Sequence, residues 1–267
     1  MQTTHLLNRA PLELIFVGLF VTMAATWIAG RWIGVRDRAR CDEDARSHAS
    51  GMHAALLGLL ALLLGFTFSM AAQRFETNRD LVAEEASAIE TAYLRTDVAA
   101  EPERLAMKDA IRRYVDTRVA FYEAKNDLKR RAAIVAESRQ LQDVLWRHAV
   151  VTAARAPSSV TALLLDGVNT VLHVYELRLH AVRNHVPRLI MWLLVFMSAA
   201  ATGLTGYVAG FGNKRHPALT GLVLALIAFV ILVIIDLDRP MRGLIHGGQE
   251  AMLDLRDMLH APLAPSR

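Results

Sequence analysis

The stretch from residue 52 to residue 95 reads MHAALLGLLALLLGFTFSMAAQRFETNRDLVAEEASAIETAYLR. Its first 21 residues, 52–72, carry no charged side chain and are long enough to cross a bilayer as a helix. No Gly or Pro follows Phe66 until Pro102, which predicts that this helix continues well beyond the membrane. The first half is apolar and the second half carries charges of both signs. Such a helix can line a pathway from membrane to water.

The whole chain is more apolar than a typical soluble protein. It has 267 residues, 54% of them hydrophobic, and a mean hydropathy of +0.28. The excess lies in four blocks that each have the length of a spanning helix. They predict an all-α membrane protein with four transmembrane helices, at about residues 14–33, 52–72, 189–211 and 218–235.

The first block could also be a cleaved signal peptide, since Arg9 precedes it and the small residues Ala24 and Ala25 lie near its middle. The apolar stretch continues through Trp27 and Ile28, however, which is long for a signal core. The length favours a membrane span.

Four spans place both termini on one side of the membrane with the long segment between the second and third spans. The predicted parts are a first membrane pair (1–72), a helical soluble domain (73–188), a second membrane pair (189–235) and a C-terminal polar segment with a short helix (236–267). Lys and Arg near the membrane number seven on each side, so the positive-inside rule selects no orientation.

The soluble segment shows apolar residues at helical spacing in three regions, 103–124, 133–155 and 158–185. Pro102 and Pro157 stand at the junctions before the first and third regions. No alternating strand pattern of useful length occurs. We therefore expect a soluble domain made only of helices.

The third membrane block has small residues every four positions on one helix face: Ser198, Thr202, Gly206 and Gly210. Small residues at this spacing let a neighbouring helix approach closely. The neighbour could belong to the same subunit or to another one.

One face of the second membrane helix is the first candidate site. Helical spacing aligns five residues, which we call the neck face: Gly58, Leu62, Phe66, Ser69 and Gln73. In a ring of such helices, Leu62 and Phe66 would form a hydrophobic constriction that can close by dewetting. The alternative is that these side chains pack against other membrane helices.

Charged residues at the membrane boundary form a second set of candidates. Arg74 and Glu76 follow the neck face, and Asp236, Asp238 and Arg239 end the fourth block. Charges there are costly unless they are paired or hydrated. They could serve as pore-exit charges, as a cation site or as a coupling element. Alternatively the carboxylates pair with nearby arginines, and two carboxylates are too few for calcium.

Two further clusters of polar residues are interpreted as solvent-exposed helix faces without a functional site. His173, Glu176 and His180 share a helical face, but it lies opposite the apolar stripe and no fourth metal ligand is indicated. We expect no metal site. A second cluster of carboxylates is interpreted as a solvated helix face: Glu84, Glu85 and Glu90.

Several function classes find no support in the sequence. No phosphate-binding loop, nucleophile elbow or catalytic constellation occurs, so we expect neither an enzyme nor a cofactor. No Lys/Arg cluster interleaved with aromatics indicates a nucleic-acid partner. The single cysteine, Cys41, cannot form an internal disulfide.

Three stretches resemble the bacterial bestrophin-like family: Gly65–Met70, Glu84–Arg95 and Asp236–Pro240. The sequence Leu64-Gly65-Phe66, followed by Arg74 and an aromatic residue, is also similar to the neck helix of bestrophin anion channels. The close resemblance covers about residues 52–95 and 187–255.

The resemblance implies a four-span subunit with a cytoplasmic helical domain, assembled into a pentameric ion channel. Under it, Phe66 matches a neck phenylalanine. Leu62 and Gly58 depart from the bestrophin pattern, which has phenylalanine and isoleucine there. The acidic run of the bestrophin calcium site is reduced to Asp236 and Asp238, so calcium gating is not implied.

The sequence thus predicts an oligomeric, bestrophin-like ion channel of the bacterial inner membrane, with the soluble domain and both termini in the cytoplasm. Its expected partners are lipid, inorganic ions and further copies of itself, most simply as a pentamer. The alternative is a non-conducting membrane scaffold or sensor whose helical domain binds a partner protein. A channel needs the neck face turned to a central axis, whereas a scaffold needs it buried.

Overall fold

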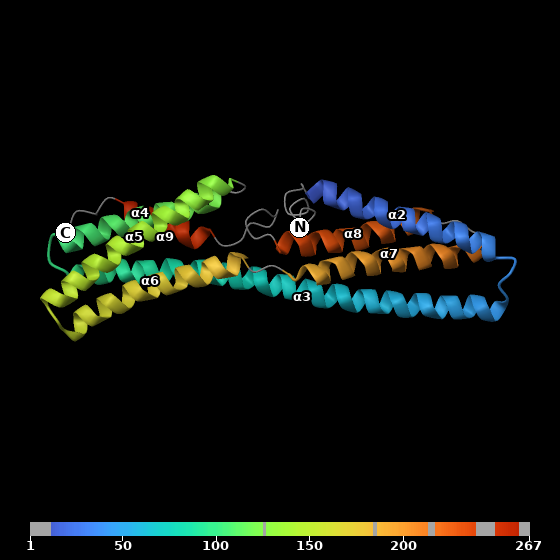
Figure 1. Cartoon of the computed structure of the whole chain (residues 1–267), viewed down its shortest axis with the longest axis horizontal. Coiled ribbons are helices and arrows are strands. Elements are labelled where there is room, and N and C mark those ends of the chain that lie inside the picture. The colour runs from blue at the N-terminus through green and yellow to red at the C-terminus, as the bar shows by residue number, and fades with distance from the viewer. Residues whose placement is uncertain (1–11, 125–126, 184–185, 213–216, 239–248, 262–267) are drawn as a thin grey trace. The chain divides into compact units, whose positions relative to one another are not determined.

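The computed structural model describes residues 12–124, 127–183, 186–212, 217–238 and 249–261 (Figure 1). All regular structure within these ranges is helical, as the sequence predicts. The helices are α2 (Leu12–Asp37), α3 (Glu43–Arg95), the short 3₁₀ helix η1 (Thr96–Val98), α4 (Glu103–Glu123), α5 (Leu128–Arg155), α6 (Ser159–Arg183), α7 (Arg188–Phe211), α8 (Pro217–Leu237) and α9 (Glu250–His260).

Four of the described helices are long and apolar enough to cross a membrane, which confirms the four predicted spans. They are α2, α3, α7 and α8. The helix α3 is 53 residues long, so the predicted continuation past the apolar block is correct. It begins at Glu43, nine residues before the predicted span, because the charged segment before Met52 is helical although it is not apolar.

The chain divides into two compact units. The membrane unit comprises residues 1–73 and 185–238, and the soluble unit comprises residues 74–184 and 239–267. The helix α3 contributes to both units, so a single unbroken backbone leads from one to the other.

In the membrane unit, α2 and α7 are in backbone contact. A Cβ atom on Gly206 would overlap the carbonyl oxygen of Trp27, and one on Gly30 would overlap the carbonyl oxygen of Gly203. One turn further along, a Cβ atom on Gly210 would lie 2.7 Å from the backbone nitrogen of Val35. The small-residue stripe of the third span therefore packs inside the subunit, which resolves the two alternatives that the sequence left open.

Two polar contacts accompany this close α2–α7 packing. The hydroxyls of Thr26 and Thr202 lie 2.9 Å apart between the two helices. On the third span, Thr202 also donates a hydrogen bond to the carbonyl of Ser198 at 2.8 Å. Each hydroxyl thus satisfies its donor within the protein, which a polar group inside a bilayer requires.

The soluble unit has its own hydrophobic core, to which α3, α4, α5, α6 and α9 contribute. The apolar positions that define the predicted faces are buried here, including Ile111, Val115, Leu145, Val168 and Tyr175. The helix α9 adds Met252, Leu255 and Leu259 to the same core.

The helix α5 starts earlier than the apolar pattern suggests, at Leu128 instead of residue 133. Asp127 is the N-cap, and its carboxylate accepts a hydrogen bond from the backbone N–H of Arg130 at 2.9 Å. The cap satisfies one of the free N–H groups of the first turn, so the helix begins before its first core residue.

Replacing Gly206 tests the α2–α7 contact. The Gly206→Ala variant should lose about 1–3 kcal/mol of stability, since the new Cβ meets backbone and not a flexible side chain. Gly221→Ala on α8 is the matched control, because nothing lies within 4 Å of a Cβ there. Thermal unfolding of both proteins in mild detergent, followed by circular dichroism, gives the comparison. Equal midpoints for the two variants would contradict the contact.

Candidate functional site

The neck face of α3 is exposed along its whole length in the single subunit. Leu62 is 55% exposed and Phe66 is 66% exposed, while Gly58, Ser69 and Gln73 also fall in the exposed class. A Cβ atom on Gly58 would meet nothing within 4 Å. No described segment of the chain therefore covers this face. That the face lines a pore stays a prediction.

Other residues of α3 within the membrane unit are packed. Leu60 is 2% exposed, Thr67 is 1% exposed and Ala71 is fully buried. The helix is held to α7 by a hydrogen bond between His53 Nε2 and the hydroxyl of Thr205, at 2.9 Å. The span thus has a packed face and an exposed face, and the residues of the neck face all belong to the exposed one.

The two charges that follow the neck face have different surroundings. Glu76 is exposed to solvent. Arg74 is half-buried, and its Nη1 atom is enclosed without a hydrogen-bond partner among the described residues. The sequence did not rank these two side chains as pore-exit charges. Glu76 is the more exposed of the two, and a pore-exit role for either stays a prediction.

The carboxylates at the end of α8 lie at the edge of the membrane unit. Asp236 is only 6% exposed. Asp238 accepts a hydrogen bond from the backbone N–H of Val186 at 2.8 Å, just before α7 begins. This contact joins the end of the fourth span to the start of the third. Arg239, the remaining predicted residue of this group, lies outside the described residues.

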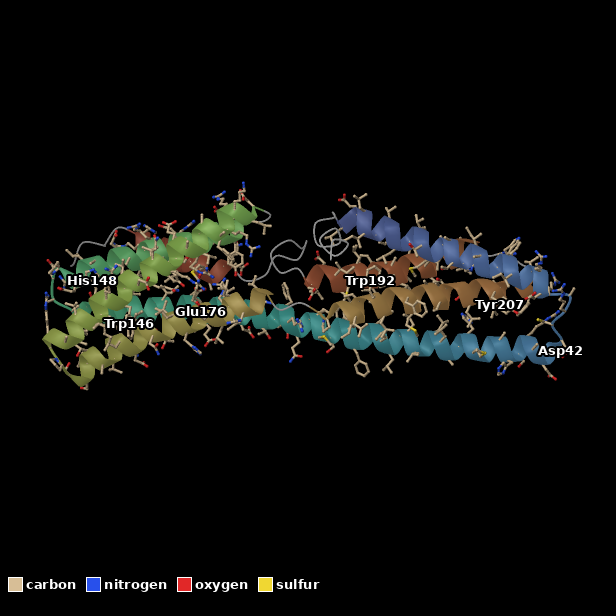
Figure 2. The ribbon with its side chains drawn as sticks, in the orientation of Figure 1. Asp42, Trp146, His148, Glu176, Trp192 and Tyr207 are labelled. Atoms are coloured by element: carbon tan, nitrogen blue, oxygen red, sulfur yellow. The ribbon has the colours of Figure 1, made fainter. Side chains whose placement is uncertain are left out.

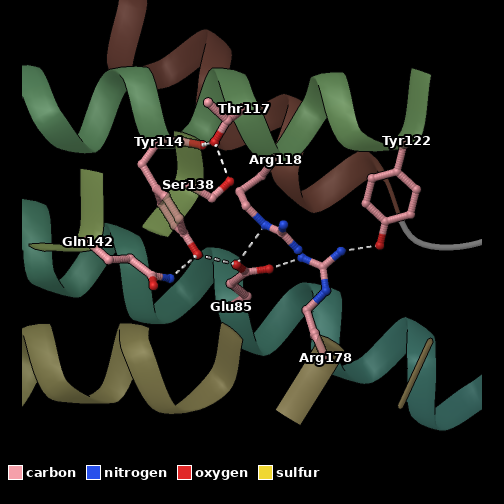
Figure 3. Close-up of polar contacts among 8 residues, drawn as sticks. All are labelled: Glu85, Tyr114, Thr117, Arg118, Tyr122, Ser138, Gln142 and Arg178. Atoms are coloured by element: carbon pink, nitrogen blue, oxygen red, sulfur yellow. Dashed lines mark hydrogen bonds and ion pairs between the residues drawn. The ribbon is translucent and has the colours of Figure 1, made fainter. Parts of the chain in front are cut away.

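The most densely connected polar site is buried in the soluble unit (Figure 3). Glu85 of α3 is fully buried and forms ion pairs with two arginines, which we call together the buried ionic cluster: Glu85, Arg118 and Arg178. Nε of Arg118 lies 2.9 Å from Oε1 of Glu85, and Nη1 of Arg178 contacts Oε2. Both arginines are 3% exposed.

Hydroxyl and amide groups extend this cluster. The hydroxyl of Tyr114 donates to Oε1 of Glu85 at 2.8 Å and accepts from the side-chain amide of Gln142 at 3.2 Å. The hydroxyl of Tyr122 accepts a hydrogen bond from Arg178. Because these residues come from α3, α4, α5 and α6, the network connects four helices of the soluble unit (Figure 3).

One carboxylate and two guanidinium groups leave a formal charge of +1 in the core. Aromatic rings lie beside both guanidiniums. The Cζ atom of Arg118 is 4.9 Å from the ring centroid of Tyr175 and 5.3 Å from that of Phe121, and Cζ of Arg178 is 5.2 Å from that of Tyr122. The negative faces of these rings offset part of the excess positive charge.

Burial sets the protonation states around the cluster. It lowers the pKa of Arg178 to about 9, which still leaves the side chain charged at neutral pH. Burial also raises the pKa of Tyr122 to about 12 and raises the pKa of Tyr114 above its usual range, with Arg118 opposing the shift in each case. Both phenols therefore stay protonated, and Tyr114 can donate to Glu85.

The interpretation of the acidic residues as a solvated face is wrong for Glu85. Glu84 and Glu90 are exposed, but Glu85 is fully buried. The overlooked signal is its register: Glu85 lies three residues after Val82 and four before Ile89, and both of these are buried. Arg118 and Arg178 occupy equivalent positions, three residues after the buried Val115 and Tyr175.

The remaining histidine and carboxylate candidates lie on the surface of α6. His173, Glu176 and His180 are all exposed, and Glu176 forms an ion pair with Arg139 of α5 at 3.5 Å. Figure 2 labels Glu176 on α6. No group of three or more metal-ligating side chains was found among the described residues.

Comparisons with known proteins identify the family. The model of the bestrophin-like domain matches residues 16–246. No curated protein matches the chain by sequence. Among solved structures, the chain is similar to a bacterial bestrophin homologue from Klebsiella pneumoniae, with a TM-score of 0.63, 16% identity, and coverage of 93% of this chain and 97% of that one. It is also similar to a crystallised membrane protein variant, with a TM-score of 0.60, 17% identity, and coverage of 91% and 99%.

Adjacent glutamates on α3 provide a test of the buried ionic cluster. Glu85→Gln leaves two buried guanidiniums without a counter-charge and should cost about 3–5 kcal/mol of stability. Glu84→Gln removes the same charge from an exposed neighbour and should stay within about 0.5 kcal/mol of the wild type. Thermal unfolding of the full chain in detergent measures both. Similar losses in the two variants would show that Glu85 has no special role.

Proposed function

Because the chain belongs to the bestrophin-like family and is a multi-pass membrane protein, we propose that it is an oligomeric ion channel of the bacterial inner membrane. The second span, α3, lines a hydrophobic neck in this proposal. The observation that carries it is the exposure of the whole neck face in the isolated subunit.

The polarity of that face supports a conducting path. Leu62 and Phe66 provide an apolar ring inside the membrane, where a narrow pore can be gated by loss of water. Toward the soluble unit the same helical spacing reaches Ser69 and Gln73, and then the exposed Glu76. An ion that leaves the constriction would therefore meet progressively more polar side chains.

Assembly follows from the geometry of one subunit. A single helix face cannot enclose water, so several copies must surround the path. We propose a cyclic homo-oligomer, with a pentamer favoured by the resemblance to bestrophins. By the same resemblance, we propose that the soluble unit and both termini lie in the cytoplasm. No catalytic activity is proposed.

The alternative is a non-conducting scaffold or sensor whose soluble unit binds a partner protein. That function requires no free face on α3, and the sequence-based expectation for it was a buried neck face. The exposure of Leu62 and Phe66 supports the channel instead.

Making the neck polar should increase ion flux. The variants Leu62→Ser and Phe66→Ser would stabilise water in the constriction and raise conductance in planar bilayers or liposomes. Leu60→Ser is the control on the packed face, where the side chain is 2% exposed, and it should lower stability without raising flux. If wild type and both neck variants are folded oligomers that pass no ions, the scaffold function is the correct one.

Glu76 should set a preference for cations. Glu76→Lys is expected to lower the cation-to-anion permeability ratio, since an exposed carboxylate beside the path attracts cations and repels anions. Glu137→Lys makes the same charge change at an exposed position of α5 and should leave the ratio unchanged. Reversal potentials under a salt gradient measure the ratio, and identical values for the two variants would contradict a role for Glu76.

A further inference from the structure

A concentration of arginines marks the end of α2 and the turn that follows. Residues 31–40 contain four of them, Arg31, Arg36, Arg38 and Arg40, with Asp37 as the only acidic residue. Just before and among them, α2 presents apolar side chains outward: Ile28 is 61% exposed, Trp32 is 64% exposed and Val35 is 52% exposed. A basic group thus directly adjoins a surface that suits the hydrocarbon of a bilayer.

Two of these guanidinium groups form cation–π contacts with tryptophan rings. Cζ of Arg36 is 5.5 Å from the ring centroid of the exposed Trp32. Cζ of Arg31 is 5.8 Å from that of Trp27, and its Nη1 donates to the carbonyl of Ala209 on α7 at 3.1 Å. A tryptophan with its ring in this position is typical of the boundary between hydrocarbon and headgroups.

The carboxylates that follow in sequence have a different role. Asp42 accepts a hydrogen bond from the backbone N–H of Ala45 at 2.8 Å, at the start of α3. Glu43 and Asp44 occupy the first turn of that helix, where negative charge is stabilised by the helix dipole. In the part of the chain that the structure describes, neither Arg36 nor Arg40 forms an ion pair with any of them.

We propose that this end of α2 binds the headgroup phosphate of an anionic phospholipid. The guanidinium groups of Arg36 and Arg40 are exposed and offer planar, paired N–H donors that match phosphate oxygens. The acyl chains of the same lipid would lie along Trp32, Ile28 and Val35. Free phosphate would use only the arginines, whereas the exposed apolar surface beside them fits a lipid. Figure 2 labels Asp42 and Tyr207 at this end of the membrane unit.

Lipid binding by the full-length protein tests this site. The purified protein is offered phosphatidylglycerol or phosphatidylcholine, and bound lipid is counted by native mass spectrometry. The wild-type protein should retain more phosphatidylglycerol than phosphatidylcholine. The double variant Arg36→Gln/Arg40→Gln should bind it about 25-fold more weakly, at roughly fivefold for each arginine. The control Arg113→Gln/Arg147→Gln removes two exposed charges from α4 and α5 and should bind like the wild type.

Three outcomes would overturn the proposal. They are equal phosphatidylglycerol binding by the two double variants, equal retention of phosphatidylcholine and phosphatidylglycerol by the wild type, and displacement of the lipid by inorganic phosphate at matched concentration. If the double variant fails gel filtration as a folded protein, Arg36→Gln alone replaces it, with an expected loss of about fivefold. The test does not depend on ion conduction.

Discussion

A carboxylate can be removed from water only where charged and polar donors replace its hydration. Glu85 meets this condition through Arg118, Arg178 and the hydroxyl of Tyr114. Tyr114 and Arg118 lie one turn apart on α4 and Arg178 lies on α6, so α3, α4 and α6 must pack in positions that bring all three donors to one pair of oxygens. Apolar residues such as Ile89 and Val115 pack in the same core, and removal of Glu85 would leave two buried guanidiniums without a counter-charge.

The helix α3 therefore has two faces with different surroundings. Its packed face carries Glu85 into the soluble core and Leu60 into the membrane unit. Its free face carries Leu62 and Phe66, and nothing described in the subunit covers them. The helix thus supplies packed residues to each unit and leaves the neck face exposed.

Much of this fold could be predicted because long apolar blocks and helical spacing are strong signals. The continuation of α3 beyond the membrane followed from the absence of Gly and Pro before Pro102. The early start of α5 and the burial of Glu85 were missed because both depend on polar contacts. A pattern of apolar residues does not reveal a capping carboxylate such as Asp127 or a charge paired inside a core. A Glu or Arg standing at a core position of its own helix was the available clue. No pattern in one sequence could show which arginine reaches which glutamate, because that depends on how the helices pack.

The backbone contact between α2 and α7 also bears on the order in which the protein is made. Gly30 and Gly203, which meet in this contact, are 173 positions apart, and the soluble helices lie between them in the sequence. At roughly 5–20 residues per second, α2 waits on the order of ten to thirty seconds for α7 to be synthesised. During that interval its glycine face lacks the helix that covers it in the folded subunit. The soluble helices α4, α5 and α6 are synthesised before α7, so the α2–α7 contact can form only after most of the soluble unit has been made.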